Sequence, residues 1–92
     1  MRIREIEYLT LESATHRLGR HLEGRLDPDT TGPTEITLQE SRQELASRLS
    51  MKPETLSRLL RHLSDAGAIV VQGRVLQVPD RKRLLAVLDA SR

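Results

Sequence analysis

The sequence predicts a mainly α-helical fold with a small antiparallel β-sheet. The chain has 92 residues, and 37% of them are hydrophobic, almost all aliphatic, which is enough for one small domain with a single core. Apolar residues recur at helical spacing along most of the chain. Near the C-terminal end, runs of Val, Ile and Leu lie on both sides of Gly73, a pattern typical of a β-hairpin.

The N-terminal part of the chain predicts two helical segments, a loop and a strand. Residues 2–9 form a short helical pattern, and Thr10 is a candidate cap for a second helix over about 11–24. The stretch LDPDTTGPTE at 26–35 combines Pro, Gly, Asp and Thr, so we expect a loop there. A brief strand is expected at 35–38.

A capping box predicts the first of two closely spaced helices. Ser41 and Glu44 have the spacing at which each side chain bonds to the backbone amide of the other. A helix over about 42–49 follows. Residues 50–52 then form a three-residue turn.

Proline and glycine mark the ends of the next helix. Pro53 has the fixed φ that suits a first helical position. Gly67 suits the left-handed conformation just past a helix end. The helix is therefore predicted over about 53–66.

The C-terminal part predicts a hairpin and a last helix. The strand-like runs lie at about 68–72 and 75–78, and Asp80 can cap a helix over about 81–90. A helix, a short turn, a second helix and a hairpin form a winged helix-turn-helix, with the wing at about 68–78.

The predicted helix over 53–66 has two chemically different faces. At 100° per residue, its apolar side chains fall on one side: Leu56, Leu59, Leu60, Leu63 and Ala66. The opposite side carries four polar side chains: Glu54, Ser57, Arg58 and Arg61. In the DNA major groove, Arg donates to guanine, Glu accepts from cytosine, and Ser lies near a thymine methyl. The alternative is a solvated face with a Glu54–Arg58 ion pair worth about 0.2–0.5 kcal/mol.

Composition limits the classes of function. Residues 1–46 carry a net charge of −3 and residues 47–92 a net charge of +5; the basic half suits a polyanion, although an arginine-rich solvated surface would give the same count. One tyrosine, with no Phe or Trp, leaves no platform for stacking unpaired bases. The chain has no cysteine and hence no disulfide or thiolate site. It has neither a membrane-spanning run nor a signal-peptide core.

These motifs carry a family resemblance. Residues 41–84 have the sequence SRQELASRLSMKPETLSRLLRHLSDAGAIVVQGRVLQVPDRKRL, with the pattern RQELA, PETLSR and GR. This stretch closely resembles the C-terminal winged helix-turn-helix DNA-binding domain of the Crp/Fnr family of bacterial transcription regulators. The resemblance extends back through SATHRLGRHL (13–22), similar to the family's linking helix. Residues 1–10 resemble the end of its dimerisation helix, so the domain proper is expected over 11–92.

The resemblance implies specific roles on the second helix. Glu54, Ser57 and Arg58 match the E-x-x-S-R pattern of the Fnr/Dnr-like branch, which implies palindromic sites with TTGAT-like half-sites. Arg58 would contact the guanine, Glu54 the paired cytosine and Ser57 a thymine. The cyclic-AMP-receptor branch more often has Gly in place of Ser57 and Arg in place of Pro53.

Two positions depart from the family pattern. Ser50 stands where Gly is frequent, so a left-handed conformation there is less favourable. Lys52 stands where Ser or Thr often caps the helix. A lysine cannot cap, and its charge opposes the helix dipole. Either Lys52 meets a phosphate or the poor cap is tolerated.

Further residues are candidates for contacts with the DNA backbone or for secondary contacts. They are Ser41, Arg42, Gln43, Lys52, Thr55, Arg61 and Arg74. For the residues at the start of the first helix, ordinary capping is the alternative. The basic run at 81–83 is interpreted as a solvated helix start. The three histidines do not form a metal-ligand set, and no nucleophile or phosphate-loop motif is present, so we expect no enzyme activity.

The resemblance also implies a larger context. It implies a homodimeric regulator that acts in the cytoplasm at the nucleoid, with a β-barrel sensor preceding this part. Ile3, Ile6 and Leu9 give barely one heptad, so this fragment is expected to be a monomer or weak dimer. No cofactor is expected in this chain; the sensor's effector stays open among haem or nitric oxide, an iron–sulfur cluster and a nucleotide. RNA polymerase stays open as a further partner. The alternative function is a winged-helix protein-interaction module without base-specific DNA binding.

Overall fold

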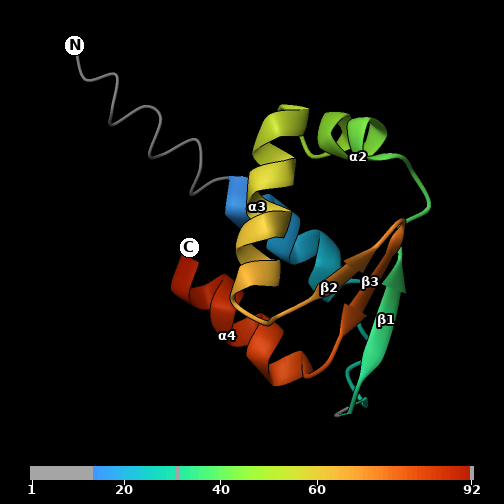
Figure 1. Cartoon of the computed structure of the whole chain (residues 1–92), viewed down its shortest axis with the longest axis vertical. Helices are drawn as coiled ribbons and strands as arrows, with labels where there is room; N and C mark the ends of the chain where they lie inside the picture. The colour runs from blue at the N-terminus through green and yellow to red at the C-terminus, as the bar shows by residue number, and fades with distance from the viewer. Residues whose placement is uncertain (1–13, 31, 92) are drawn as a thin grey trace.

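The computed structural model describes residues 14–30 and 32–91 (Figure 1). A helix at 14–23 leads into a loop. The elements that follow are β1 (Thr34–Thr37), α2 (Arg42–Arg48), α3 (Pro53–Asp65), β2 (Val70–Gln72), β3 (Val75–Val78) and α4 (Arg81–Ser91). The predicted fold class, a mainly α-helical winged helix-turn-helix with a small antiparallel sheet, is confirmed. The helical pattern at 2–9 and the predicted cap at Thr10 lie outside the described residues.

The sheet has three antiparallel strands in the order β1-β3-β2. Ile36 of β1 and Val71 of β2 both align with Leu76 of the central strand. Ile36, Leu76 and Val78 are buried, whereas every residue of the edge strand β2 is exposed. One face of the β1–β3 pair therefore closes the core, and β2 projects from it as the wing.

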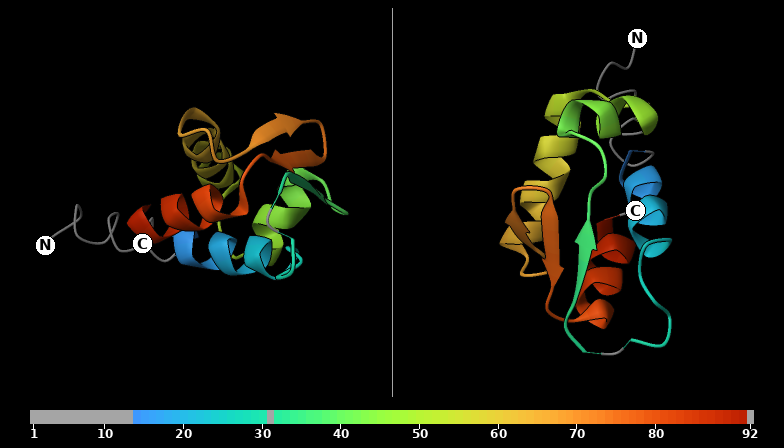
Figure 2. Two further views of the ribbon diagram at one scale, coloured as in Figure 1. Left: turned by 90° about the horizontal axis from the view of Figure 1, so that it is seen from below. Right: turned by 90° about the vertical axis from the view of Figure 1, so that its right-hand side faces the viewer.

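The helices cover the core from two sides. Figure 2 shows the helix at 14–23 beside α4, on the side of the domain opposite α3. Their apolar faces meet in one cluster, to which each helix contributes leucines: Leu18, Leu22, Leu45, Leu56, Leu60, Leu63, Leu84 and Leu88. Burying a leucine contributes about 1.5–3 kcal/mol. This packing fixes the orientation of α3.

The end of α3 follows from Gly67. The Gly67 backbone is left-handed (φ 75°). Its amide donates to the Ser64 carbonyl (3.0 Å), and the Ala68 amide donates to the Leu63 carbonyl (2.9 Å), which is the Schellman pattern. Ala66 is the exposed C-cap. The helix thus ends one residue earlier than predicted, and Ala66 does not share the burial of the leucines on its side of the helical wheel.

The end of α2 has the same hydrogen-bond pattern without a glycine. The Ser50 amide donates to the Ser47 carbonyl (3.1 Å), and the Met51 amide donates to the Ala46 carbonyl (2.9 Å). Ser50 occupies the left-handed position (φ 56°). A side chain there crowds the following carbonyl at a cost of about 1–2 kcal/mol. The unfavourable conformation predicted for Ser50 is therefore present.

Candidate nucleic-acid interface

The first two turns of α3 carry an exposed polar face opposite a buried apolar face. Glu54, Ser57 and Arg58 are exposed, and Thr55 is partly buried. Leu56, on the opposite side, is fully buried (0% exposed). Because the leucine face anchors the helix, these polar side chains are held on the outside of the domain.

The charged groups of this face are largely unengaged within the fold. Among the described residues, Glu54 and Arg58 form no ion pair with each other, so the alternative prediction of this pair is not supported. Arg61 instead approaches Asp65, with 3.9 Å between Nε and Oδ2. Both partners are highly exposed, so solvent screens this contact. No described residue bonds to Arg58, so its guanidinium donors are available.

Lys52 precedes this face and leaves the helix start uncapped. It has the extended backbone of an N-cap, but its side chain makes no capping hydrogen bond. The first amides of a helix have no helical acceptor, and the N-terminal end carries partial positive charge. Lys52 adds a full charge beside them. The start of α3 therefore favours an anion.

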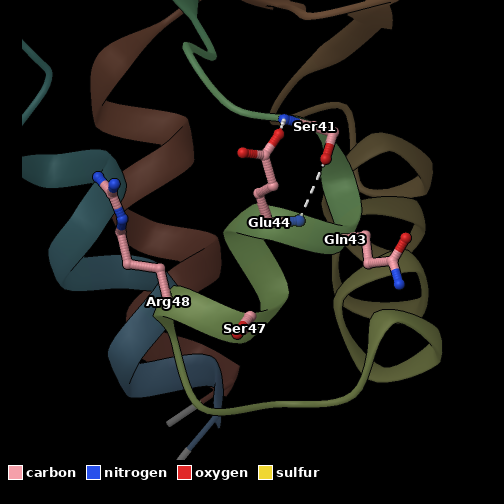
Figure 3. Close-up of a pocket in the computed structure, with 5 residues that line it drawn as sticks. All are labelled: Ser41, Gln43, Glu44, Ser47 and Arg48. Carbon is pink, nitrogen blue, oxygen red and sulfur yellow. Dashed lines mark hydrogen bonds between the residues drawn. The ribbon is translucent and has the colours of Figure 1, made fainter.

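At the start of α2, the capping box engages one predicted contact residue and leaves its neighbour available. The Ser41 amide donates to Glu44 Oε1 (3.1 Å), and the Glu44 amide donates to Ser41 Oγ (3.2 Å; Figure 3). Hydrogen bonding from the Ser41 amide, and secondly from its side chain, lowers the pKa of the Glu44 carboxyl. Gln43 points away from this pair in Figure 3. With Ser47 and Arg48 it lines a shallow depression. Ser47, one turn after Gln43, lines this depression but is not among the residues predicted from the sequence.

Two predicted phosphate contacts hold the wing. Arg42 Nη2 donates to the Gly73 carbonyl at the wing tip (2.8 Å), and Arg74 Nη1 donates to the Gln39 carbonyl before α2 (3.2 Å). The Leu38 amide donates to the Arg74 carbonyl (2.7 Å). Both arginines thus join the wing to the helix-turn-helix, and each retains further guanidinium donors.

The residue before the N-cap of α2, Glu40, carries a buried carboxylate. Glu40 is 8% exposed, and its Oε2 lies 3.1 Å from Arg48 Nη1. Nearby, burial lowers the pKa of His21, while the charge of Glu40 partly opposes this. Nε2 of His21 and Oε1 of Glu40 have no hydrogen-bond partner among the residues that the structure describes. In residues 14–30 and 32–91, no group of His, Cys, Asp or Glu is placed to hold a metal ion. Likewise, no helix of these ranges has the length and apolarity that crossing a bilayer requires.

Comparison with known proteins identifies the family. The model of the Crp-like helix-turn-helix domain matches residues 9–87. The chain belongs to this family. It is a DNA-binding domain of the Crp/Fnr type, as the sequence resemblance predicts. No match is found among the curated proteins.

Solved structures agree with this assignment of a Crp-like domain. DNR from Pseudomonas aeruginosa is 35% identical with a TM-score of 0.79, and the match covers 99% of this chain and 38% of DNR. A Ruegeria pomeroyi protein, described as a candidate cyclic-nucleotide-binding protein, is 33% identical with a TM-score of 0.65 over 85% of this chain and 32% of that chain. The Thermus thermophilus catabolite activator protein (22% identity, TM-score 0.63, 96% of this chain and 39% of that chain) shares the fold. This Crp-like domain thus spans about a third to two-fifths of these proteins.

Proposed function

We propose that this domain recognises the base sequence of double-stranded DNA through the first two turns of α3. Arg58 donates two hydrogen bonds to a guanine, Glu54 accepts from the paired cytosine, and Ser57 lies against a thymine. The observation that carries the proposal is the set of exposed side chains Glu54, Ser57 and Arg58 on a helix whose other face is buried. A carboxylate and a guanidinium that do not pair with each other remain available for base edges.

Contacts to the phosphate backbone supply most of the affinity. Lys52 and the uncapped start of α3 are the strongest candidates, because the lysine charge and the unbonded first amides belong to the same end of the helix. Gln43, Thr55 and Arg61 are further candidates for such contacts. Arg42 and Arg74 contribute through the guanidinium donors that the fold leaves unused. Ser41, which the capping box engages, contributes by holding the start of α2 in place.

The half-site and the wider assembly are further parts of the proposal. The match of Glu54, Ser57 and Arg58 to the E-x-x-S-R pattern supports a TTGAT-like half-site. Two copies on a palindrome, in a homodimeric cytoplasmic regulator, would place two such helices in successive major grooves. RNA polymerase is a further partner of that regulator.

The test is a titration with a duplex that contains the TTGAT half-site and with a scrambled duplex. Arg58→Ala is expected to cost about 1–3 kcal/mol on the specific duplex and to relax the preference at the guanine. Lys52→Ala is expected to weaken both duplexes alike and to reduce the salt slope by about 1. The control is Arg20→Ala, which removes an exposed charge from the helix at 14–23. Unchanged affinity and preference in Arg58→Ala would contradict base recognition.

A second candidate function is docking of a protein on the wing. Val70 and Val71 are 44% and 36% exposed on the edge strand β2, and such an edge can pair with another chain. This function predicts equal, weak binding to both duplexes and no effect of Arg58→Ala. The same titration therefore separates the two functions.

A further inference from the structure

One arginine of the helix at 14–23 bonds to the turn between α2 and α3. Arg17 Nε donates to the Leu49 carbonyl (2.6 Å), and Arg17 Nη2 donates to the Ser50 carbonyl (3.1 Å). Leu49 is the C-cap of α2, and Ser50 is the residue with the left-handed backbone. The bonds therefore join the N-terminal helix to the connection from which α3 begins.

The positive charge and the donors of Arg17 suit the C-terminal end of α2. The last carbonyls of a helix lack helical donors, and the negative end of the α2 dipole favours a cation. The planar guanidinium donates to two adjacent acceptors in a fixed geometry. Ser50 holds a conformation that its own side chain disfavours. Arg17 thus supplies, from outside the two-helix motif, bonds that stabilise its strained turn.

Arg17 acts from the side away from the proposed DNA-facing surface. The helix that carries it lies opposite α3 in Figure 2. We propose that Arg17 is a positioning residue for base recognition: by fixing the α2–α3 turn, it ties the orientation of α3 to the helix at 14–23. This inference rests on the proposed function of α3. Movement of the helix at 14–23 would then change the positions of Glu54, Ser57 and Arg58 relative to the bases.

The experiment compares matched variants of the whole chain. Arg17→Ala removes both bonds, and Arg17→Lys keeps the charge without the two-acceptor geometry. Arg20→Ala removes the same charge from an exposed position on the same helix. Ser50→Gly in the Arg17→Ala background relieves the left-handed strain without restoring the bonds. Each variant is titrated with the TTGAT duplex and the scrambled duplex, and amide hydrogen exchange is followed at Ser50 and Met51.

Arg17→Ala is expected to lower affinity for the TTGAT duplex about tenfold, because both charge-assisted bonds that position the start of α3 are lost. Affinity for the scrambled duplex is expected to fall much less. Exchange at Ser50 and Met51 is expected to rise by a similar factor, because their bonds close the turn. Arg17→Lys falls between Arg17→Ala and wild type. Arg20→Ala matches wild type in exchange and preference, and the added Ser50→Gly recovers much of the lost preference.

Two outcomes overturn the inference. In one, Arg17→Ala and Arg20→Ala lower binding to both duplexes equally, which would mean that Arg17 affects binding only through its charge. In the other, Arg17→Ala lowers stability but keeps the wild-type preference and exchange at the turn. If Arg17→Ala does not fold, Arg17→Lys decides by the same two readouts. A wild-type domain without any base preference would instead refute the proposed function.

Discussion

Ser50→Gly is expected to stabilise the domain by about 0.5–1 kcal/mol. The left-handed backbone at Ser50 (φ 56°) costs a residue with a side chain about 1–2 kcal/mol. Glycine removes that cost but raises the entropy of the unfolded chain, which offsets about 0.4–1 kcal/mol. The Ser50 side chain is exposed, and the bond from Arg17 goes to the backbone carbonyl. The substitution by glycine therefore keeps this bond.

Urea and thermal unfolding measure this effect. For a domain of this size, the change raises Tm by about 2–8 °C and shifts the urea midpoint without changing m. Ser47→Gly is the matched control, because the same substitution inside α2 is expected to destabilise by about 0.5 kcal/mol. Gly67→Ala is the reverse test at the equivalent place in α3 (φ 75°). It should destabilise by about 1 kcal/mol.

The stabilities of the three glycine and alanine variants can together refute the strain at Ser50. If Ser50→Gly is no more stable than wild type while Ser47→Gly and Gly67→Ala behave as expected, the turn at Ser50 is not strained. The recovery expected of Ser50→Gly in the Arg17→Ala background would then lose its physical basis.

Two further predictions concern the partly buried His21 and the wing. Burial lowers the pKa of His21 below its usual 6.5, so the unfolded chain binds the proton more readily and stability falls as pH drops through that value. Urea midpoints across this range should show the slope in wild type and lose it in His21→Gln, and a slope unchanged in the variant would assign it to another group. Arg42→Ala removes the bond to the Gly73 carbonyl and should speed amide exchange in the β2–β3 hairpin several-fold. Gln43→Ala, at the exposed neighbouring position, should not, and equal exchange in both variants would show that Arg42 does not hold the wing.

Short sequence motifs predicted where the helices begin and end. The capping box at Ser41 and Glu44, Pro53 at a helix start and Gly67 past a helix end all have the predicted places. Each acts within one turn of the chain, so residue type and spacing are sufficient to predict it. The buried and exposed faces of α3 follow from periodicity in the same way, apart from the position of Ala66.

The suggested pair of Glu54 with Arg58 has suitable spacing, yet the structure does not contain it. Both side chains are exposed. In water, the attraction of such a pair is comparable with the entropy lost in forming it. Spacing alone therefore cannot decide whether it forms. This outcome favours the availability of both groups for DNA.

The sequence by itself determined the order of elements, the helix ends and the identity of the polar face on α3, because these depend on interactions over a few residues. Only the tertiary structure decided that Arg42 and Arg74 hold the wing and that Arg17 holds the turn before α3. These bonds join residues 31 to 35 positions apart. Their partners are backbone carbonyls, which every residue has. Only the packing of the core decides which carbonyl comes within reach of a given arginine.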